Sequence, residues 1–156
     1  MSDRPPTGPS TIGAMPRAAA LLVYGSAAPI AALLAILALG GVGSFTADDA
    51  IAALLSYAAV LLTFHAGMAC GQAIRTGRQN VRLGITVLLA LAAWGTLLVP
   101  GSAGPLVLAA LTAAQGALDV WSADGIRAPA WYGRLRAGAT VITVVLLVAA
   151  FALTPR

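Results

Sequence analysis

The sequence predicts an all-α fold, a polytopic membrane protein with five transmembrane helices. Hydrophobic residues make up 60% of its 156 positions, and charged residues only 9%. The mean hydropathy is +0.91. Long apolar runs alternate with short connections that carry arginine, glycine or proline. A soluble domain of this length cannot bury so much apolar surface, so we expect the lipid bilayer to cover most of it.

The charges are unusual in kind, since all nine cations are arginine and all five anions are aspartate. Together with abundant alanine and glycine, this suggests a GC-rich bacterial coding sequence, so we predict the bacterial cytoplasmic (inner) membrane. A pI near 10.2 could indicate nucleic-acid binding in a soluble protein. Here the arginines stand in short loops beside apolar spans, where the positive-inside rule explains them. We therefore expect no nucleic-acid partner.

Residues 1–16 are rich in proline and glycine and predict a flexible cytoplasmic tail, followed by one transmembrane domain over residues 17–156. The first span covers residues 18–39, too long for the apolar region of a signal peptide. Pro29 lies inside it and predicts a kink near Ser26 to Pro29. Such a proline is tolerated when neighbouring helices or hydroxyls satisfy the freed carbonyl.

The remaining predicted spans follow in order as residues 50–74, 83–99, 106–121 and 137–153. Glycines at positions 40, 41 and 43 mark a turn before the second span. Asp48 and Asp49 come next, where carboxylates favour a helix N-terminus by capping and through the helix dipole.

Five alternating spans allow the arginines to be assigned to sides. Eight of the nine fall on one side, and Arg156 alone falls on the other. Because cytoplasmic loops carry the excess of cations, we predict a cytoplasmic N-terminus and a C-terminus outside.

Polar residues within the spans are few, and each needs a partner or a purpose because polar groups are costly in hydrocarbon. Helical spacing places them in stripes on the second, fourth and fifth spans. The intramembrane polar candidates are His65, Gln72, Thr112, Gln115, Asp119, Arg136, Thr140 and Thr143.

Asp119 ends the fourth span and Arg136 begins the fifth on the same side of the membrane, so we predict an ion pair between them. Arg82 is an alternative partner. A proton-titrating or ligand-binding carboxylate is the competing interpretation.

His65 is the single histidine. We expect a neutral imidazole hydrogen-bonded to another helix, through Gln115 or Tyr57. A proton relay and an axial haem ligand are the alternatives. Two histidine ligands are impossible within one copy, which leaves Met68 or another methionine as a partner, a five-coordinate haem or a haem shared in a dimer. No cofactor and no metal site are otherwise expected, and the lone Cys70 forms no internal disulfide.

Small residues on the second span predict close helix packing. Gly67 and Gly71 have G-x-x-x-G spacing, and Ser56 and Thr63 continue the small-residue face. Internal packing is favoured, with homodimer formation as the alternative.

The run from Ala128 to Arg136 collects aromatic and basic residues in a chain with few of either. Pro129, Trp131, Tyr132 and Arg134 are typical of an interfacial anchor at the cytoplasmic side.

Enzyme motifs for nucleotide, zinc or serine-hydrolase chemistry are absent from the sequence. Ser56, His65 and Asp119 have no spacing that would build a catalytic triad. We therefore predict that the protein is not an enzyme.

Several of these residues resemble an uncharacterised domain family that includes mitochondrial transmembrane protein 69. The likeness covers about residues 16 to 152, and its most specific part is the run P-x-W-Y-x-x-L-R-x-x-x-T. It rests on Tyr24, Gly25, Pro29, Ser56, Tyr57, Phe64, His65, Gly67, Gly71, Asp119, Pro129, Trp131, Tyr132, Leu135, Arg136 and Thr140. The resemblance implies a membrane-helical fold and candidate sites, but no activity.

Two functional hypotheses follow. The first is a non-enzymatic accessory or assembly factor of a larger membrane complex, or a homo-oligomer. The analogy with mitochondrial relatives extends this hypothesis to a respiratory complex. The second is a small transporter or proton-conducting protein that uses His65, Gln115 and Asp119. A broken helix limited to Pro29 and the lack of an inverted repeat argue mildly against the second.

Overall fold

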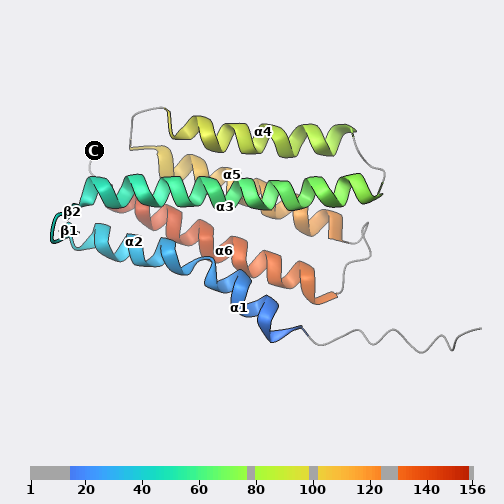
Figure 1. The fold of residues 1–156 in the computed structure, drawn as a ribbon, viewed down its shortest axis with the longest axis horizontal. Helices are drawn as coiled ribbons and strands as arrows, with labels where there is room; N and C mark the ends of the chain where they lie inside the picture. The colour runs from blue at the N-terminus through green and yellow to red at the C-terminus, as the bar shows by residue number, and fades with distance from the viewer. Residues whose placement is uncertain (1–14, 77–79, 99–101, 124–129, 155–156) are drawn as a thin grey trace, which may run out of the picture.

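The computed structural model describes residues 15–76, 80–98, 102–123 and 130–154, and these ranges are almost wholly helical. Figure 1 shows the helices side by side in one elongated bundle. The predicted helical class is confirmed. The helices are α1 (Arg17–Gly25), α2 (Ala28–Ala38), α3 (Ala47–Thr76), α4 (Asn80–Thr96), α5 (Gly104–Ala123) and α6 (Ala130–Leu153).

A small hairpin, absent from the all-α prediction, joins α2 to α3. Its strands β1 (Gly41–Val42) and β2 (Phe45–Thr46) have two residues each and pair antiparallel. Gly40, Gly41 and Gly43 have positive φ angles of 76°, 120° and 60°. Only glycine adopts such angles readily, so the predicted turn is confirmed, and strands this short leave no period-2 pattern to read.

The first span is broken where the proline predicts it. α1 ends at Gly25 and α2 begins at Ala28, with Pro29 in its first turn. The Ser26 hydroxyl donates to the Val23 carbonyl at 2.7 Å. The Tyr57 hydroxyl of α3 donates to the Ser26 carbonyl at 2.9 Å. A neighbouring helix thus satisfies a carbonyl exposed by the break, as expected of proline in a membrane helix.

Four helical stretches of the described residues are long and apolar enough to cross a membrane, one fewer than the five predicted. They are Arg17–Ala38, which joins α1 and α2, then Ala47–Ile74, Gly104–Trp121 and Trp131–Leu153. The third predicted span, 83–99, corresponds to α4, whose apolar part Leu83–Thr96 is shorter. At 1.5 Å per residue, that part covers about 21 Å of a hydrocarbon core about 30 Å thick.

α6 also begins earlier than the predicted start at residue 137. It starts at Ala130, so Arg134 and Arg136 belong to its first two turns and not to a loop. The helix continues because this stretch holds no proline and contains arginine, leucine and alanine, which are good helix formers. Residues 1–14 of the predicted tail and Pro129 of the predicted anchor lie outside the described residues.

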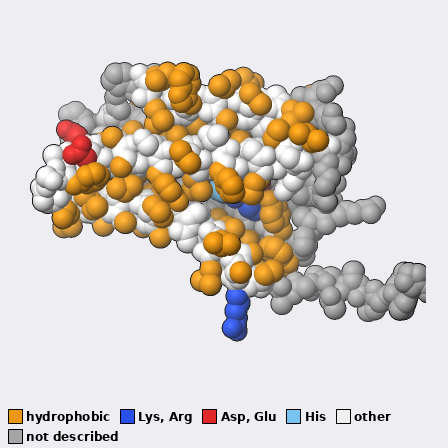
Figure 2. Space-filling view, viewed as in Figure 1, with side chains coloured by type: hydrophobic (Ala, Val, Ile, Leu, Met, Phe, Trp, Pro, Cys, Tyr) orange, Lys and Arg blue, Asp and Glu red, His pale blue; other side chains and the backbone are white. Residues whose placement is uncertain are grey.

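The core is built from small and branched aliphatic residues, while large apolar side chains face outward. Ile30, Leu54, Leu108 and Leu147 are fully buried, whereas Leu88, Trp94 and Trp121 are exposed. Figure 2 shows hydrophobic side chains spread over the face in view, with acidic residues at one end. An apolar exterior around a tightly packed, alanine-rich interior is the pattern expected when lipid surrounds the bundle.

Candidate intramembrane polar site

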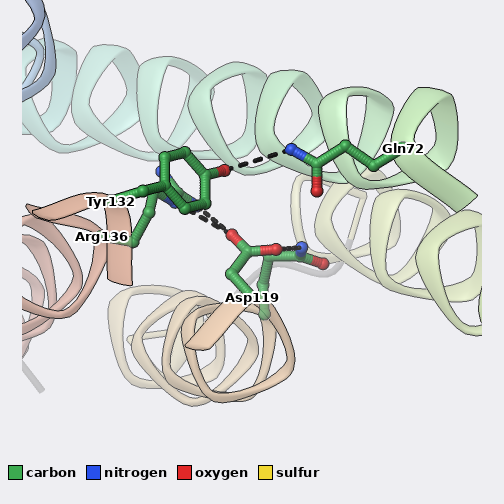
Figure 3. A network of polar contacts seen from close by, with 5 residues as sticks. Gln72, Asp119, Tyr132 and Arg136 are labelled. Atoms are coloured by element: carbon green, nitrogen blue, oxygen red, sulfur yellow. Dashed lines mark hydrogen bonds and ion pairs between the residues drawn. The ribbon is translucent and has the colours of Figure 1, made fainter. Parts of the chain in front are cut away.

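The predicted partners Asp119 and Arg136 meet where α5 ends and α6 begins. Arg136 donates from Nε to Oδ2 of Asp119 at 3.0 Å, and its Nη2 donates to the same oxygen. The two side chains are 6% and 3% exposed. Figure 3 shows the guanidinium and the carboxylate pointing toward one another. Two opposite charges at this depth are tolerable because each neutralises the other.

Gln115 completes the carboxylate's contacts. Its Nε2 donates to Oδ1 of Asp119 at 2.8 Å, from one helical turn earlier on α5. Both oxygens of Asp119 therefore accept hydrogen bonds from inside the bundle, as the dashed lines in Figure 3 show. Oε1 of Gln115, by contrast, is buried with no partner among the described residues.

A second polar contact joins α3 to α6 near the same end of the bundle. Gln72 donates from Nε2 to the Tyr132 hydroxyl at 3.3 Å, visible in Figure 3. Tyr132 is half-buried and meets the Trp131 ring edge-on, with ring centroids 6.3 Å apart. Trp131 is also half-buried, and Arg134 is exposed. Of the predicted anchor, Tyr132 thus contributes to the polar site as well as to the helix end.

His65 does not make either of the hydrogen bonds predicted for it. Tyr57 donates to Ser26, and the Gln115 amide nitrogen donates to Asp119. The break between α1 and α2 places the Ser26 carbonyl beside Tyr57, which no spacing rule reveals. His65 is half-buried and contacts the Phe64 ring, with centroids 5.9 Å apart.

The imidazole instead lines a small cavity whose wall is partly polar and partly apolar. Its wall is formed by α3, α5, α6 and the break between α1 and α2, and the space open to a water-sized sphere is about 10 Å³. A haem does not fit a cavity of this size. Within the described ranges, no three His, Cys, Asp or Glu residues gather as a metal site. The polar lining residues are Ser26, His65, Thr112, Gln115, Arg136, Thr140 and Thr143.

The internal packing predicted for Gly67 and Gly71 is wrong. Both are exposed, and a Cβ built on either would meet nothing within 4 Å. Ser56 and Thr63 are exposed too, and their hydroxyls donate to the carbonyls of Ala52 and Ala59 on their own helix. The G-x-x-x-G spacing identifies a helix face that another helix could approach closely, but it does not show whether that face lies towards the interior or the exterior of the bundle.

The close helix contacts occur at glycines that sequence reasoning missed. A Cβ on Gly116 of α5 would overlap the Thr140 side chain of α6, and one on Gly138 would stand 2.8 Å from the Tyr24 hydroxyl. Gly116 lies one residue after Gln115, and Thr140 lies four after Arg136. The signal in the sequence that could have identified this contact is a glycine directly beside a stripe of polar residues on the same helix.

This fold and this site define a helical membrane protein in which the buried side chains of Gln115, Asp119 and Arg136 bond to one another. The chain belongs to the family described as "Protein of unknown function (DUF3429)", whose family model matches residues 15–152. No curated protein and no solved structure matches the chain. The match confirms the expectation of an uncharacterised domain family and covers the helical part of the chain up to the penultimate residue of α6.

Proposed function

We propose that the protein is a non-enzymatic integral membrane protein that acts through helix contacts, as an accessory or assembly factor of a larger membrane complex. The main support for this proposal is that the Asp119 carboxylate of the polar site is buried and already hydrogen-bonded within the protein. Asp119 is 6% exposed and both of its oxygens accept hydrogen bonds from Arg136 and Gln115. A carboxylate held in this way stabilises helix packing and offers no free oxygen to a substrate.

The arrangement of the helices supports five crossings, with α4 as the short one. Figure 1 shows α3 and α5 running in the same direction, away from the end where β1 and β2 lie. The chain must therefore return along the bundle between them, and α4 makes that return. We propose a bacterial inner membrane, with the N-terminus in the cytoplasm and the C-terminus outside, on the strength of the arginine distribution.

The partner we propose is a second membrane protein or complex that covers part of the apolar exterior. An apolar groove of about 360 Å³ lies between α3 and α4, lined by Ala59, Val60, Thr63, Phe64, Trp94 and Leu97. The resemblance to a domain family that includes mitochondrial transmembrane protein 69 favours a respiratory complex, by analogy alone.

Co-purification in a mild detergent, followed by mass spectrometry, tests the proposal. We expect a stoichiometric membrane partner with the wild-type chain. Its recovery should fall with Trp94→Ala, which changes the groove, and should persist with Trp121→Ala, an exposed tryptophan outside it. If the chain extracted from native membranes purified alone, without a stoichiometric partner, the proposal would be contradicted.

A small transporter or proton-conducting protein is the second candidate, because His65, Gln115 and Arg136 line one cavity. Reconstituted liposomes discriminate the two functions. A pH-dependent ion flux that disappears with His65→Ala would favour conduction over the accessory role.

A further inference from the structure

A residue that lines the cavity between α3, α5 and α6 has a buried polar atom with no hydrogen-bond partner among the described residues. Gln115 is 1% exposed, and its Oε1 has no partner among the described residues. The side chain also lines the cavity. Buried acceptors in proteins are nearly always satisfied, so an unpaired one beside a cavity indicates a missing donor.

The direction of the Gln115 amide is fixed by its neighbour. An ionised carboxylate can only accept hydrogen bonds, so the amide nitrogen must face Asp119, as it does at 2.8 Å. A flipped amide would set two acceptors against each other. The oxygen is consequently forced to the opposite side, away from the carboxylate.

The ligand that fits must be a small, neutral hydrogen-bond donor. The space available is about 10 Å³, at the lower limit for a single water molecule. Arg136 lines the cavity and disfavours a cation, while the unpaired acceptor disfavours an anion. The hydroxyls of Thr112 and Thr143 and the His65 ring line the same space and supply the further partners that a buried water needs.

We propose that this cavity binds one water molecule, which donates to Oε1 of Gln115 and connects His65 of α3 to the polar network of α5 and α6. The water extends the network from the Asp119–Arg136 pair to a third helix. The inference does not depend on the accessory role proposed above.

The single histidine provides a unique probe. Protein labelled with ¹⁵N-histidine and reconstituted in liposomes gives the ring-nitrogen signals of a single imidazole in solid-state NMR. We expect magnetisation to pass from water protons to His65 in the wild type. An absence of transfer in the wild type would overturn the proposal without any variant.

Two neighbouring alanines supply a variant and its control. Ala58 and Ala59 are 3% and 4% exposed, but only Ala58 lines the cavity. Ala58→Val should fill the space and reduce the transfer at least five-fold, whereas Ala59→Val should leave it unchanged. Full transfer in a folded Ala58→Val protein would show that water reaches His65 by another route and would overturn the assignment. Should Ala58→Val not fold, Thr143→Val, which exchanges a lining hydroxyl for a methyl, tests the same loss.

Discussion

Gly116 of α5 lies directly beneath the Thr140 side chain of α6. A Cβ built on Gly116 would stand 2.8 Å from the Cβ of Thr140 and closer still to the rest of that side chain. This contact belongs to the most extensive helix pair in the protein, α5 with α6. The absence of a side chain at position 116 therefore lets the two helices approach closely enough to align Asp119 with Arg136.

Gly116→Ala should push the helices apart. We expect a loss of about 1–3 kcal/mol in the free energy of unfolding, as for other overpacked cores, measured by thermal or denaturant unfolding in detergent micelles. Gly67→Ala is the control, since nothing lies within 4 Å of its Cβ position. That change should be neutral, or stabilising by up to about 1 kcal/mol through helix propensity. Equal losses at both positions would contradict the close contact.

Breaking the ion pair from one side should be more damaging than removing it altogether. Asp119→Leu or Arg136→Met alone leaves an uncompensated buried charge, with an expected loss of about 3–5 kcal/mol. The double variant should recover at least half of the larger single loss, because neither charge remains. The fraction of monodisperse protein in size-exclusion chromatography and the unfolding midpoint measure the effect. A double variant less stable than both single variants would count against the pairing.

The sequence was most informative where one residue has one strong physical consequence. Pro29 predicted the break between α1 and α2, and the positions of Asp119 and Arg136 at facing helix ends predicted their pairing. Helix rotation was harder, because α3 and α5 carry alanine or glycine on several faces and their apolar periodicity is weak. Gly67 and Gly71 therefore looked like a packing face, while the contact was made at Gly116. The hydrogen-bond partner of His65 could not be predicted for the same reason, because it depends on how these helices are rotated about their axes.

Tyr57→Phe tests how the broken first span is held. Loss of the hydroxyl leaves the Ser26 carbonyl without the bond it now receives at 2.9 Å, with an expected cost of about 1–3 kcal/mol. Pro29→Ala restores a backbone N–H at position 29 and lets the first span straighten. In that background, Tyr57→Phe should cost less than half as much. If the two losses of stability are additive in a double-mutant cycle, the Tyr57 hydroxyl does not act through the helix break at Pro29.

The start of α3 offers a test of helix capping outside the core. Thr46 Oγ1 accepts from the Asp49 N–H at 3.1 Å, and Oδ2 of Asp49 accepts from the Thr46 N–H at 2.9 Å. This reciprocal arrangement is a capping box in which aspartate replaces glutamate. Thr46→Ala should lower stability by about 0.5–2 kcal/mol, read from the unfolding midpoint. Asp48→Ala, which removes an exposed acid of the same turn, should change it by less than about 1 kcal/mol.

The short helix α4 is the point at which the proposed topology can fail. α3 and α5 run in parallel in Figure 1, so a crossing α4 places residues 44 and 102 on one side of the membrane and residue 76 on the other. With Cys70, the single cysteine, replaced by alanine, Ser44→Cys and Ser102→Cys should react with a membrane-impermeant maleimide in intact cells. Thr76→Cys should react only after permeabilisation. A helix with an apolar part of about 21 Å must tilt little or thin the bilayer to cross a core of about 30 Å. Labelling of Ser102→Cys only after permeabilisation, alongside Thr76→Cys, would show that α4 lies at the interface and that four spans cross.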